Sequence, residues 1–257
     1  MKKEFAAFVF ILVGFLPLGV LAADDHNCSR YCDYIDLLID VSEPHEINIG
    51  SIHESARLGD SFSKFNLGLI YLNGIAVDPD KGKAFYWMEQ AAKDGLVEAQ
   101  YNLAVFYHKA WGVDWDLVQA RKWYEIAAGN GYVFAIYNLA RMYEYGAGGN
   151  KDYVISKEYY EMAAEAGIHI ALSRIGRFYL DGKGVDKDYK KALMLFREGA
   201  SHSESESIYQ LSSLYLSGLG VKKDVSKGIE LTKQAALLGS NNAKKEMEYF
   251  DKQRRLK

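Results

Sequence analysis

The chain has 257 residues, of which 49% are hydrophobic and three are proline, and its formal net charge is −3. This composition is typical of a globular protein and excludes a disordered or fibrous chain. Binding to nucleic acid or to an anionic membrane requires a basic surface, which the overall charge does not provide.

Residues 1–22 have the order of a secretory signal peptide: two lysines, an apolar run, and the small residues Val20 and Ala22 before an acidic pair. The apolar run is near the lower length limit for a membrane span, so a retained anchor is the alternative. Pro17 interrupts the run and favours cleavage. We therefore expect export without a stable membrane anchor. The short basic start indicates a bacterial periplasm, with the extracellular medium as the alternative.

The two cysteines, Cys28 and Cys32, lie in the next segment, residues 23–45. An oxidising compartment favours a disulfide between them. Cα atoms four residues apart are separated by about 6 Å in a helix and by about 13 Å in an extended segment, so pairing requires a turn or helix. With His26, the cysteines match no standard zinc site, and we expect no metal. Whether the cysteines pair, and whether this segment is ordered, stays open.

An internal repeat predicts the fold of the remaining chain. From residue 63 to residue 242, one pattern recurs five times at a constant spacing of 36 residues. The clearest positions are Leu67, Leu103, Leu139, Ile175 and Leu211; Tyr71, Tyr107, Tyr143, Tyr179 and Tyr215; and Asp80, Asp116, Asp152, Asp188 and Asp224. Such a period indicates identical structural units that stack on one another.

Each period contains two helical patterns joined by a glycine-rich turn. In the first pattern, apolar or small residues recur four apart, as in Ala99, Leu103 and Tyr107, and therefore share one helix face. The second pattern begins at the recurrent aspartate, a good N-cap whose charge suits the positive end of the helix dipole. Glycine at the end of most first helices predicts a left-handed cap. Ala110 replaces this glycine once, so we expect that turn to differ locally.

Helices at both ends are expected to cap the array, because a terminal hairpin otherwise exposes its apolar face. Residues 46–62 contain an isolated second-helix pattern, and residues 243–257 resemble a first helix in which charged residues dominate. The predicted fold class is therefore all-α: a solenoid of about five helix-hairpin repeats, residues 63–242, with a capping helix at each end.

The repeat reads Ala-x-x-x-Leu-Gly-x-x-Tyr-x-x-Gly, then Gly-Val-x-x-Asp, Lys-Ala-x-x-Trp and Ala-Ala-x-x-Gly. It resembles the Sel-one-like repeat (SLR) family, a relative of the tetratricopeptide repeats. The resemblance implies a right-handed superhelix whose concave groove binds a protein partner, in a secreted bacterial scaffold or adaptor for host interaction or signalling. An immunity protein that neutralises a delivered toxin is the alternative. Cysteine-rich relatives are linked with β-lactam hydrolysis, but the repeats of this chain carry no cysteine, so a hydrolase is disfavoured.

The sequence contains no pattern that indicates catalysis. The six histidines fall at unrelated positions of the repeat, and none forms a His-x-x-x-His spacing. No Gly-x-Ser-x-Gly elbow is present, and the glycine-rich turns follow no strand, as a phosphate loop would. We therefore expect a protein that is not an enzyme, with no catalytic residue and no cofactor.

In the stacking that the resemblance implies, the groove is lined by first-helix residues that face away from their own second helix. The candidate partner-binding residues on three such ladders are Tyr101, Tyr137 and Tyr209; Arg141 and Arg177; and His108. For the tyrosines, aromatic packing between repeats is the favoured alternative. The two arginines lie one repeat apart and could offer paired guanidinium groups to a carboxylate of the partner, with two solvated charges as the alternative. The partner's identity and the oligomeric state are not predicted.

Overall fold

The computed structural model describes residues 48–255, which form twelve α-helices and no strand. The helices are α2 (Ile49–Arg57), α3 (Ser61–Asn73), α4 (Lys81–Lys93), α5 (Val97–Lys109), α6 (Leu117–Gly129), α7 (Val133–Tyr145), α8 (Tyr153–Glu165), α9 (Ile170–Asp181), α10 (Tyr189–Ser201), α11 (Ser205–Ser217), α12 (Val225–Leu237) and α13 (Asn241–Arg255). The expected signal peptide and the segment with Cys28 and Cys32 lie outside the described residues.

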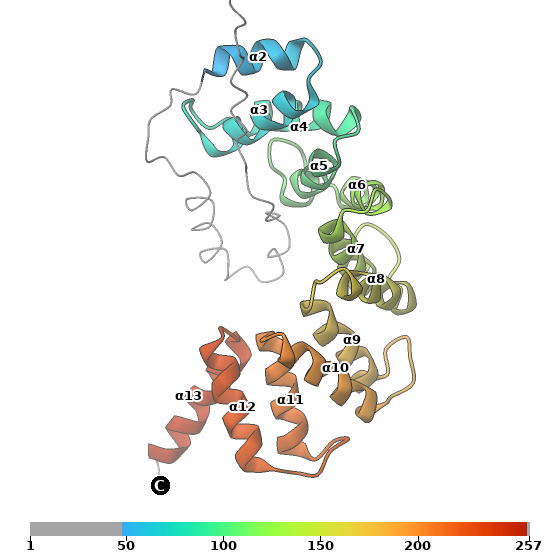
Figure 1. Cartoon of the computed structure of the whole chain (residues 1–257), viewed down its shortest axis with the longest axis vertical. Coiled ribbons are helices and arrows are strands. Elements are labelled where there is room, and N and C mark those ends of the chain that lie inside the picture. Colours follow the sequence, from blue (N-terminus) through green and yellow to red (C-terminus); the bar gives the residue numbers. More distant parts are fainter. Residues whose placement is uncertain (1–47, 256–257) are drawn as a thin grey trace, which may run out of the picture.

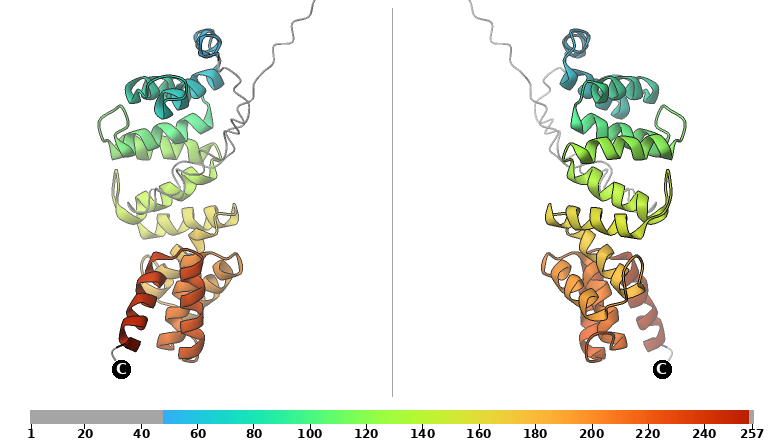
Figure 2. Two further views of the ribbon diagram at one scale, coloured as in Figure 1. Left: turned by 90° about the vertical axis from the view of Figure 1, so that its left-hand side faces the viewer. Right: turned by 90° about the vertical axis from the view of Figure 1, so that its right-hand side faces the viewer.

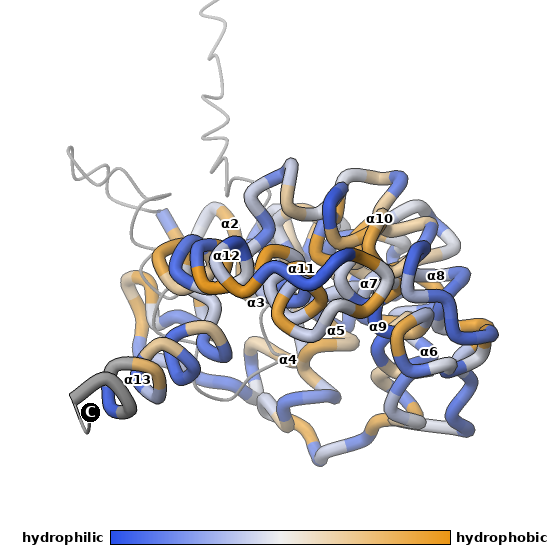
Figure 3. The backbone as a smooth tube through the Cα atoms, turned by 90° about the horizontal axis from the view of Figure 1, so that it is seen from below, coloured by the Kyte–Doolittle hydropathy of each residue, from blue (hydrophilic) through white to orange (hydrophobic). Residues whose placement is uncertain are grey.

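The helices form consecutive hairpins that stack into one curved rod (Figure 1). Each first helix packs on the following second helix, and each second helix packs on the next first helix. The two side views show the hairpins following one another along the long axis (Figure 2). Seen along that axis, α5, α7 and α9 lie nearer the middle, while α6 and α8 lie at the margin (Figure 3). This arrangement confirms the predicted all-α solenoid.

Helices α2 and α13 pack on α3 and α12 at the two ends of the array. The first of these is shorter than the expected 46–62, because Asp60 already caps the next helix: its side chain accepts a hydrogen bond from Ser63 N at 2.7 Å. None of the helices in the described part of the chain is long and apolar enough to cross a membrane.

The recurrent aspartates cap the second helices, as the sequence predicts. In every repeat the carboxylate accepts a hydrogen bond from the backbone N–H three residues later, at 2.9–3.0 Å. The capping residues are Asp80, Asp116, Asp152, Asp188 and Asp224. Each cap satisfies a helix N–H that has no partner within its own helix, so the start of every second helix is set by a local signal.

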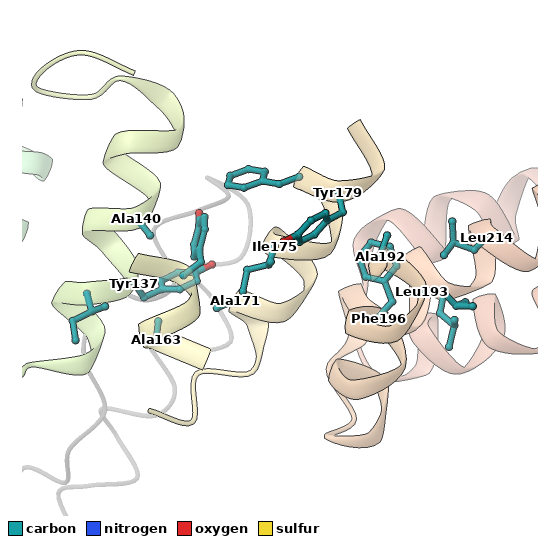
Figure 4. Close-up of a cluster of buried hydrophobic side chains, with 14 of the residues drawn as sticks. Tyr137, Ala140, Ala163, Ala171, Ile175, Tyr179, Ala192, Leu193, Phe196 and Leu214 are labelled. Carbon is teal, nitrogen blue, oxygen red and sulfur yellow. The ribbon is translucent and has the colours of Figure 1, made fainter. Parts of the chain in front are cut away.

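Buried apolar side chains fill the space between helices along the whole rod. The largest cluster runs from α7 to α11, and many of its members are drawn in Figure 4. Small residues permit the close packing: a Cβ on Gly176 of α9 would overlap the ring of Phe196 on α10. The apolar core is therefore continuous between repeats rather than confined within each hairpin.

The turns of the second to fifth hairpins contact the preceding repeat. Gly112, Gly148, Gly184 and Gly220 all have φ between +68° and +70°. A Cβ at Gly148 would overlap the backbone carbonyl oxygen of Leu117, at the start of α6. Glycine is therefore required at this position for two reasons: the backbone is left-handed, and a second backbone segment lies too close for a Cβ.

The third turn contains Gly149 where all four of the other turns carry valine. The guanidinium group of Arg121 occupies the space beside Gly149, and a Cβ there would overlap it. Arg121 lies 3.7 Å above the centre of the Tyr143 ring and pairs with Glu125 at 3.3 Å. Glycine in place of valine therefore leaves space for Arg121, which forms a cation–π contact between consecutive repeats.

Ala110 adopts the same left-handed cap as the glycines at the equivalent position. Its φ and ψ are 55° and 43°, and its N–H donates to the carbonyl oxygen of Phe106. The expectation of a different turn was wrong. Backbone hydrogen bonds hold both ends of this turn against α5: Trp111 N donates to Phe106 O at 3.0 Å, and Asp116 N donates to Tyr107 O at 3.2 Å.

Replacing Ala110 with glycine is expected to raise the free energy of unfolding by about 0.5–1 kcal/mol, because a left-handed conformation is unfavourable for alanine. Urea denaturation measures the change. Ala166 ends α8 with φ −81°, so the same substitution there removes no strain and serves as the control. An unchanged or lower urea midpoint for Ala110→Gly would contradict the assigned strain.

Candidate protein-binding groove

Polar side chains of α5, α7 and α9 gather on one surface, which we call the arginine face: His108, Arg141, Tyr145, Arg174 and Arg177. On α7, Arg141 and Tyr145 are four residues apart, and on α9, Arg174 and Arg177 are three apart, so each pair shares one helix face. Arg174 Nη1 donates to Tyr145 Oη at 3.3 Å and links the two helices. Tyr145 is 55% exposed, so this surface is open to solvent.

The arginines of this face lack carboxylate partners. Among the described residues, Arg141, Arg174 and Arg177 form no ion pair. Arg141 Nε is buried and has no hydrogen-bond partner. A buried donor without an acceptor costs about 1–3 kcal/mol, and more when the group is charged. An anionic group that supplied oxygen acceptors to these guanidinium groups would stabilise the arginine face.

Glu144 of α7 is an acidic group close to Arg174 on this surface, and a hydrogen bond already engages its carboxylate. The Tyr160 hydroxyl of α8 donates to Glu144 Oε2 at 2.7 Å. Burial raises the pKa of Tyr160 well above its ordinary value, so the phenol stays neutral and keeps its proton for this bond. Glu144 thus ties the first helix of the hairpin to the second.

Arg174 was not among the residues predicted for the groove, although the sequence contains a signal for it. The equivalent position is asparagine in the first three repeats, Asn66, Asn102 and Asn138. Asn138 Nδ2 donates to Tyr101 Oη at 3.3 Å, across the boundary between two repeats. Arg174 replaces this asparagine one repeat later and, with its longer side chain, reaches Tyr145. Its departure from the repeat pattern marks it as a candidate site residue.

Tyr101 and Tyr137 do not line the arginine face, because both side chains are fully buried. The Tyr101 ring lies 5.7 Å from the Tyr124 ring and 4.9 Å from the Tyr132 ring. The Tyr137 ring lies 5.5 Å from the Tyr160 ring of its own hairpin. Both rings pack against aromatic side chains of the core, so neither tyrosine is exposed on a groove as the prediction has it, although the Tyr137 hydroxyl lies beside Arg174. Aromatic packing, the favoured alternative, describes them.

Tyr209 also lies away from the arginine face. It is partly buried on α11 beside Glu246 of α13, and burial followed by the charge of Glu246 raises its pKa. The side chain therefore belongs to the contact between the fifth repeat and the C-terminal capping helix. Of the predicted groove residues, the structure brings His108 close to Arg141, and Arg177 occupies the position equivalent to Arg141 on the next first helix.

His108 lies in the last turn of α5, beside Arg141, and is partly buried. Burial lowers the pKa of its imidazole, and the positive charges of Lys109 and Arg141 lower it further. The folded chain thus holds His108 neutral at a pH where the unfolded chain protonates it. Stability from this residue is present above about pH 6.5, the ordinary pKa of histidine, and is lost as the pH falls through the folded pKa.

The variant His108→Gln is expected to lose less stability than the wild type on acidification, because glutamine cannot become charged beside Arg141. Thermal midpoints measured between about pH 7.5 and about pH 5 test this expectation. The wild-type midpoint should fall more steeply than that of the variant over this range. Parallel curves would show that His108 contributes nothing to the pH dependence.

The described residues contain no group of three or more His, Cys, Asp or Glu side chains arranged to hold a metal ion. The chemistry available on the arginine face is therefore the recognition of an anion by guanidinium, phenol and imidazole groups. Carboxylates suit these donors, because guanidinium groups form paired hydrogen bonds with carboxylate oxygens.

The family model of the Sel1 repeat matches residues 61–96, 97–132, 133–168, 169–203 and 205–240. A protective antigen present in uropathogenic Escherichia coli strains, which displays an SLR fold, is 32% identical with a TM-score of 0.69, over 75% of this chain and 41% of that chain. A Sel1 repeat protein from Oxalobacter formigenes is 30% identical with a TM-score of 0.68, over 72% and 73% of the two chains. This chain thus spans less than half of the length of the Escherichia coli antigen. The curated protein sequences include no significant match.

Proposed function

The chain belongs to the Sel1 repeat family, whose repeats generally act as non-catalytic scaffolds for protein–protein interaction, and on this premise we propose that it binds an acidic segment of a partner protein through the arginine face. The observation that carries the proposal is that Arg141, Arg174 and Arg177 form no ion pair among the described residues. A carboxylate of the partner would pair with these guanidinium groups and neutralise the local positive charge.

The spacing of the arginines favours a peptide segment over a single small anion. Arg141 and Arg177 belong to consecutive first helices, α7 and α9, and are separated by one complete repeat. An extended chain advances about 3.3 Å per residue, so acidic side chains a few residues apart can reach both guanidinium groups. Hydrogen bonds to charged groups contribute about 1.5–3 kcal/mol each.

The double variant Arg141→Ala/Arg177→Ala tests this function. Immobilised wild-type protein and variant are exposed to the same periplasmic extract, and the bound proteins are identified by mass spectrometry. We expect the variant to bind the captured partner at least about tenfold more weakly, with a melting temperature no lower than that of the wild type, because both arginines act on the partner rather than on the fold. A toxic effector among the captured proteins would indicate an immunity role instead of a scaffold.

Lys122→Ala is the matched control, because Lys122 is an exposed cation on the second helix α6. It removes one positive charge and leaves the arginine face intact, so capture should persist. If the double variant retained the same proteins at wild-type levels, the arginine face would not be the binding surface.

We further propose that the protein acts after export to the periplasm, with the extracellular medium as the alternative. The support is the charge, apolar run and small residues of the segment 1–22. Protein purified from the periplasmic fraction of its host should begin at Ala23. Recovery of a chain that begins at Met1 in the cytoplasm would contradict this proposal.

A further inference from the structure

A cleft lies between the second helices α8 and α10, above the first helix α9. Its floor is apolar and includes Leu172, Ile175 and Leu195. A helix turns by about 100° per residue, so Leu172 and Ile175 lie on the side of α9 opposite Arg174 and Arg177. The α8–α10 cleft is therefore separate from the arginine face.

The cleft coincides with a change in the repeat pattern. The position of Leu195 is aromatic in the first three repeats: Trp87, Trp123 and Tyr159. Trp123 packs against the core clusters on both sides of its repeat boundary, and Tyr159 does the same at the next boundary. Leu195 is smaller and has no ring, so the boundary between the third and fourth repeats lacks the aromatic side chain that fills the earlier ones.

The two ends of the cleft differ in charge. At one end, the His169 and His202 rings stack at 3.5 Å with an angle of 5° between their planes. Glu165 and Glu198 line the same end, because they lie in the last turns of α8 and α10, and neither forms an ion pair among the described residues. At the other end, Lys191 lies 4.4 Å from the centre of the Tyr179 ring.

The length of the cleft suits a short peptide segment. Lys191 and His202 are eleven residues apart on α10, which corresponds to about 16 Å along the helix axis. This distance accommodates an aromatic side chain over Leu195 and a neighbouring cationic side chain at the glutamate end. Glu161 lines the cleft as well but already pairs with Lys157 at 2.8 Å.

We propose that the α8–α10 cleft binds a protein segment in which an aromatic residue stands next to a lysine or arginine. The ring takes the place of the missing aromatic side chain against Leu172, Ile175 and Leu195. The cation lies between Glu165 and Glu198, where the opposite charge attracts it. Together with the arginine face, which suits an acidic segment, the cleft gives the scaffold two recognition surfaces of opposite charge on opposite sides of α9.

Tryptamine, an indole ring with a primary ammonium group, is the probe for the full chain. Amide NMR spectra recorded during titration should show saturable shifts around α8, α9 and α10, with a dissociation constant in the millimolar range typical of a fragment. Indole-3-acetate has the same ring with a negative charge and should bind at least about tenfold more weakly. Equal binding of the two compounds, or no saturable binding of tryptamine, would overturn the proposal.

The variant Leu195→Trp restores the aromatic residue of the earlier repeats and should weaken tryptamine binding at least about tenfold by filling the cleft. Met194→Trp is the control, because Met194 is the adjacent residue on α10 and is 68% exposed. If Leu195→Trp does not fold, Glu165→Gln/Glu198→Gln provides the test on two exposed side chains and should weaken tryptamine binding at least about fivefold. Wild-type affinity in either cleft variant would overturn the proposal.

The variant Arg141→Ala/Arg177→Ala should bind tryptamine as the wild type does. Its behaviour separates the two surfaces: loss of partner capture with tryptamine binding retained reports on the arginine face alone. A failure of the cleft proposal would leave the proposed function of the arginine face untouched.

Discussion

Gly148→Ala is expected to lower the free energy of unfolding by about 2–5 kcal/mol, from the left-handed backbone and from overpacking together. Gly148 has φ +68°, and its Cβ would overlap the carbonyl oxygen of Leu117. The Cβ is fixed directly to the backbone, and the atom that it meets is a backbone oxygen, so no side-chain rotation relieves the clash. The turn of the third repeat would have to move away from the start of α6.

Gly131→Ala is the matched control for this prediction. Gly131 also has a positive φ, +82°, but a Cβ there meets no atom within 4 Å. Its cost should therefore be the backbone strain alone, about 1–2 kcal/mol. Urea denaturation compares the two variants, and equal losses would show that contact between the repeats does not explain the requirement for glycine at Gly148.

Hydrogen exchange gives a second readout for Gly148→Ala. The stability of a repeat array depends largely on the contacts between neighbouring repeats. Weakening the contact between the second and third repeats should accelerate amide exchange most strongly in α6 and α7, next to the altered turn. Uniform acceleration along the whole array would instead indicate a general loss of stability.

Tyr137→Ala is expected to lower the free energy of unfolding by about 3–5 kcal/mol, the usual cost of removing a fully buried aromatic side chain. The Tyr137 side chain has no solvent exposure and packs against Tyr160. Tyr137→Phe retains the ring and should cost less than about 1.5 kcal/mol. The same urea measurement distinguishes the two variants.

Tyr86→Ala is the control for the buried tyrosine. Tyr86 is 53% exposed on α4, so its removal should change stability by less than about 1 kcal/mol. If Tyr137→Ala cost no more than Tyr86→Ala, Tyr137 would not be part of the core. It would then have to be considered again as a residue that contacts a partner.

The two proposed recognition surfaces lie where individual repeats depart from the shared pattern. On α9, arginine replaces asparagine at Arg174, and on α10, leucine replaces an aromatic residue at Leu195. Residues at the shared positions pack the core, cap helices or form turns, so their substitution lowers the stability of the fold. Residues on helix faces that do not pack against neighbouring repeats can differ from the pattern without loss of the fold. Specificity for a partner can develop at such positions.

Locally encoded features could be predicted from the sequence. The 36-residue period indicates the number of hairpins, and an aspartate such as Asp152 marks the start of a second helix through a hydrogen bond to a residue three positions away. These signals act over a few residues and need no tertiary contact. For the same reason, Arg141 and Arg177 were found as a pair at one position of the repeat.

The assignment of helix faces could not be made in the same way. In α7, seven residues are buried, including both Tyr137 and Leu139, because a first helix contacts its own second helix, the preceding second helix and the neighbouring first helix. Most of its circumference is therefore covered. A spacing rule taken from related repeats does not show which few residues of the first helix remain exposed to a partner.

The amino-acid sequence by itself determined the repeat length, the helix ends and the family of this protein, because each depends on residues that are close along the chain. The tertiary structure alone decided that Tyr101 is core and that Arg174 joins Tyr145. These features depend on contacts between neighbouring helices, whose close packing imposes a conformation or burial that no single helix specifies.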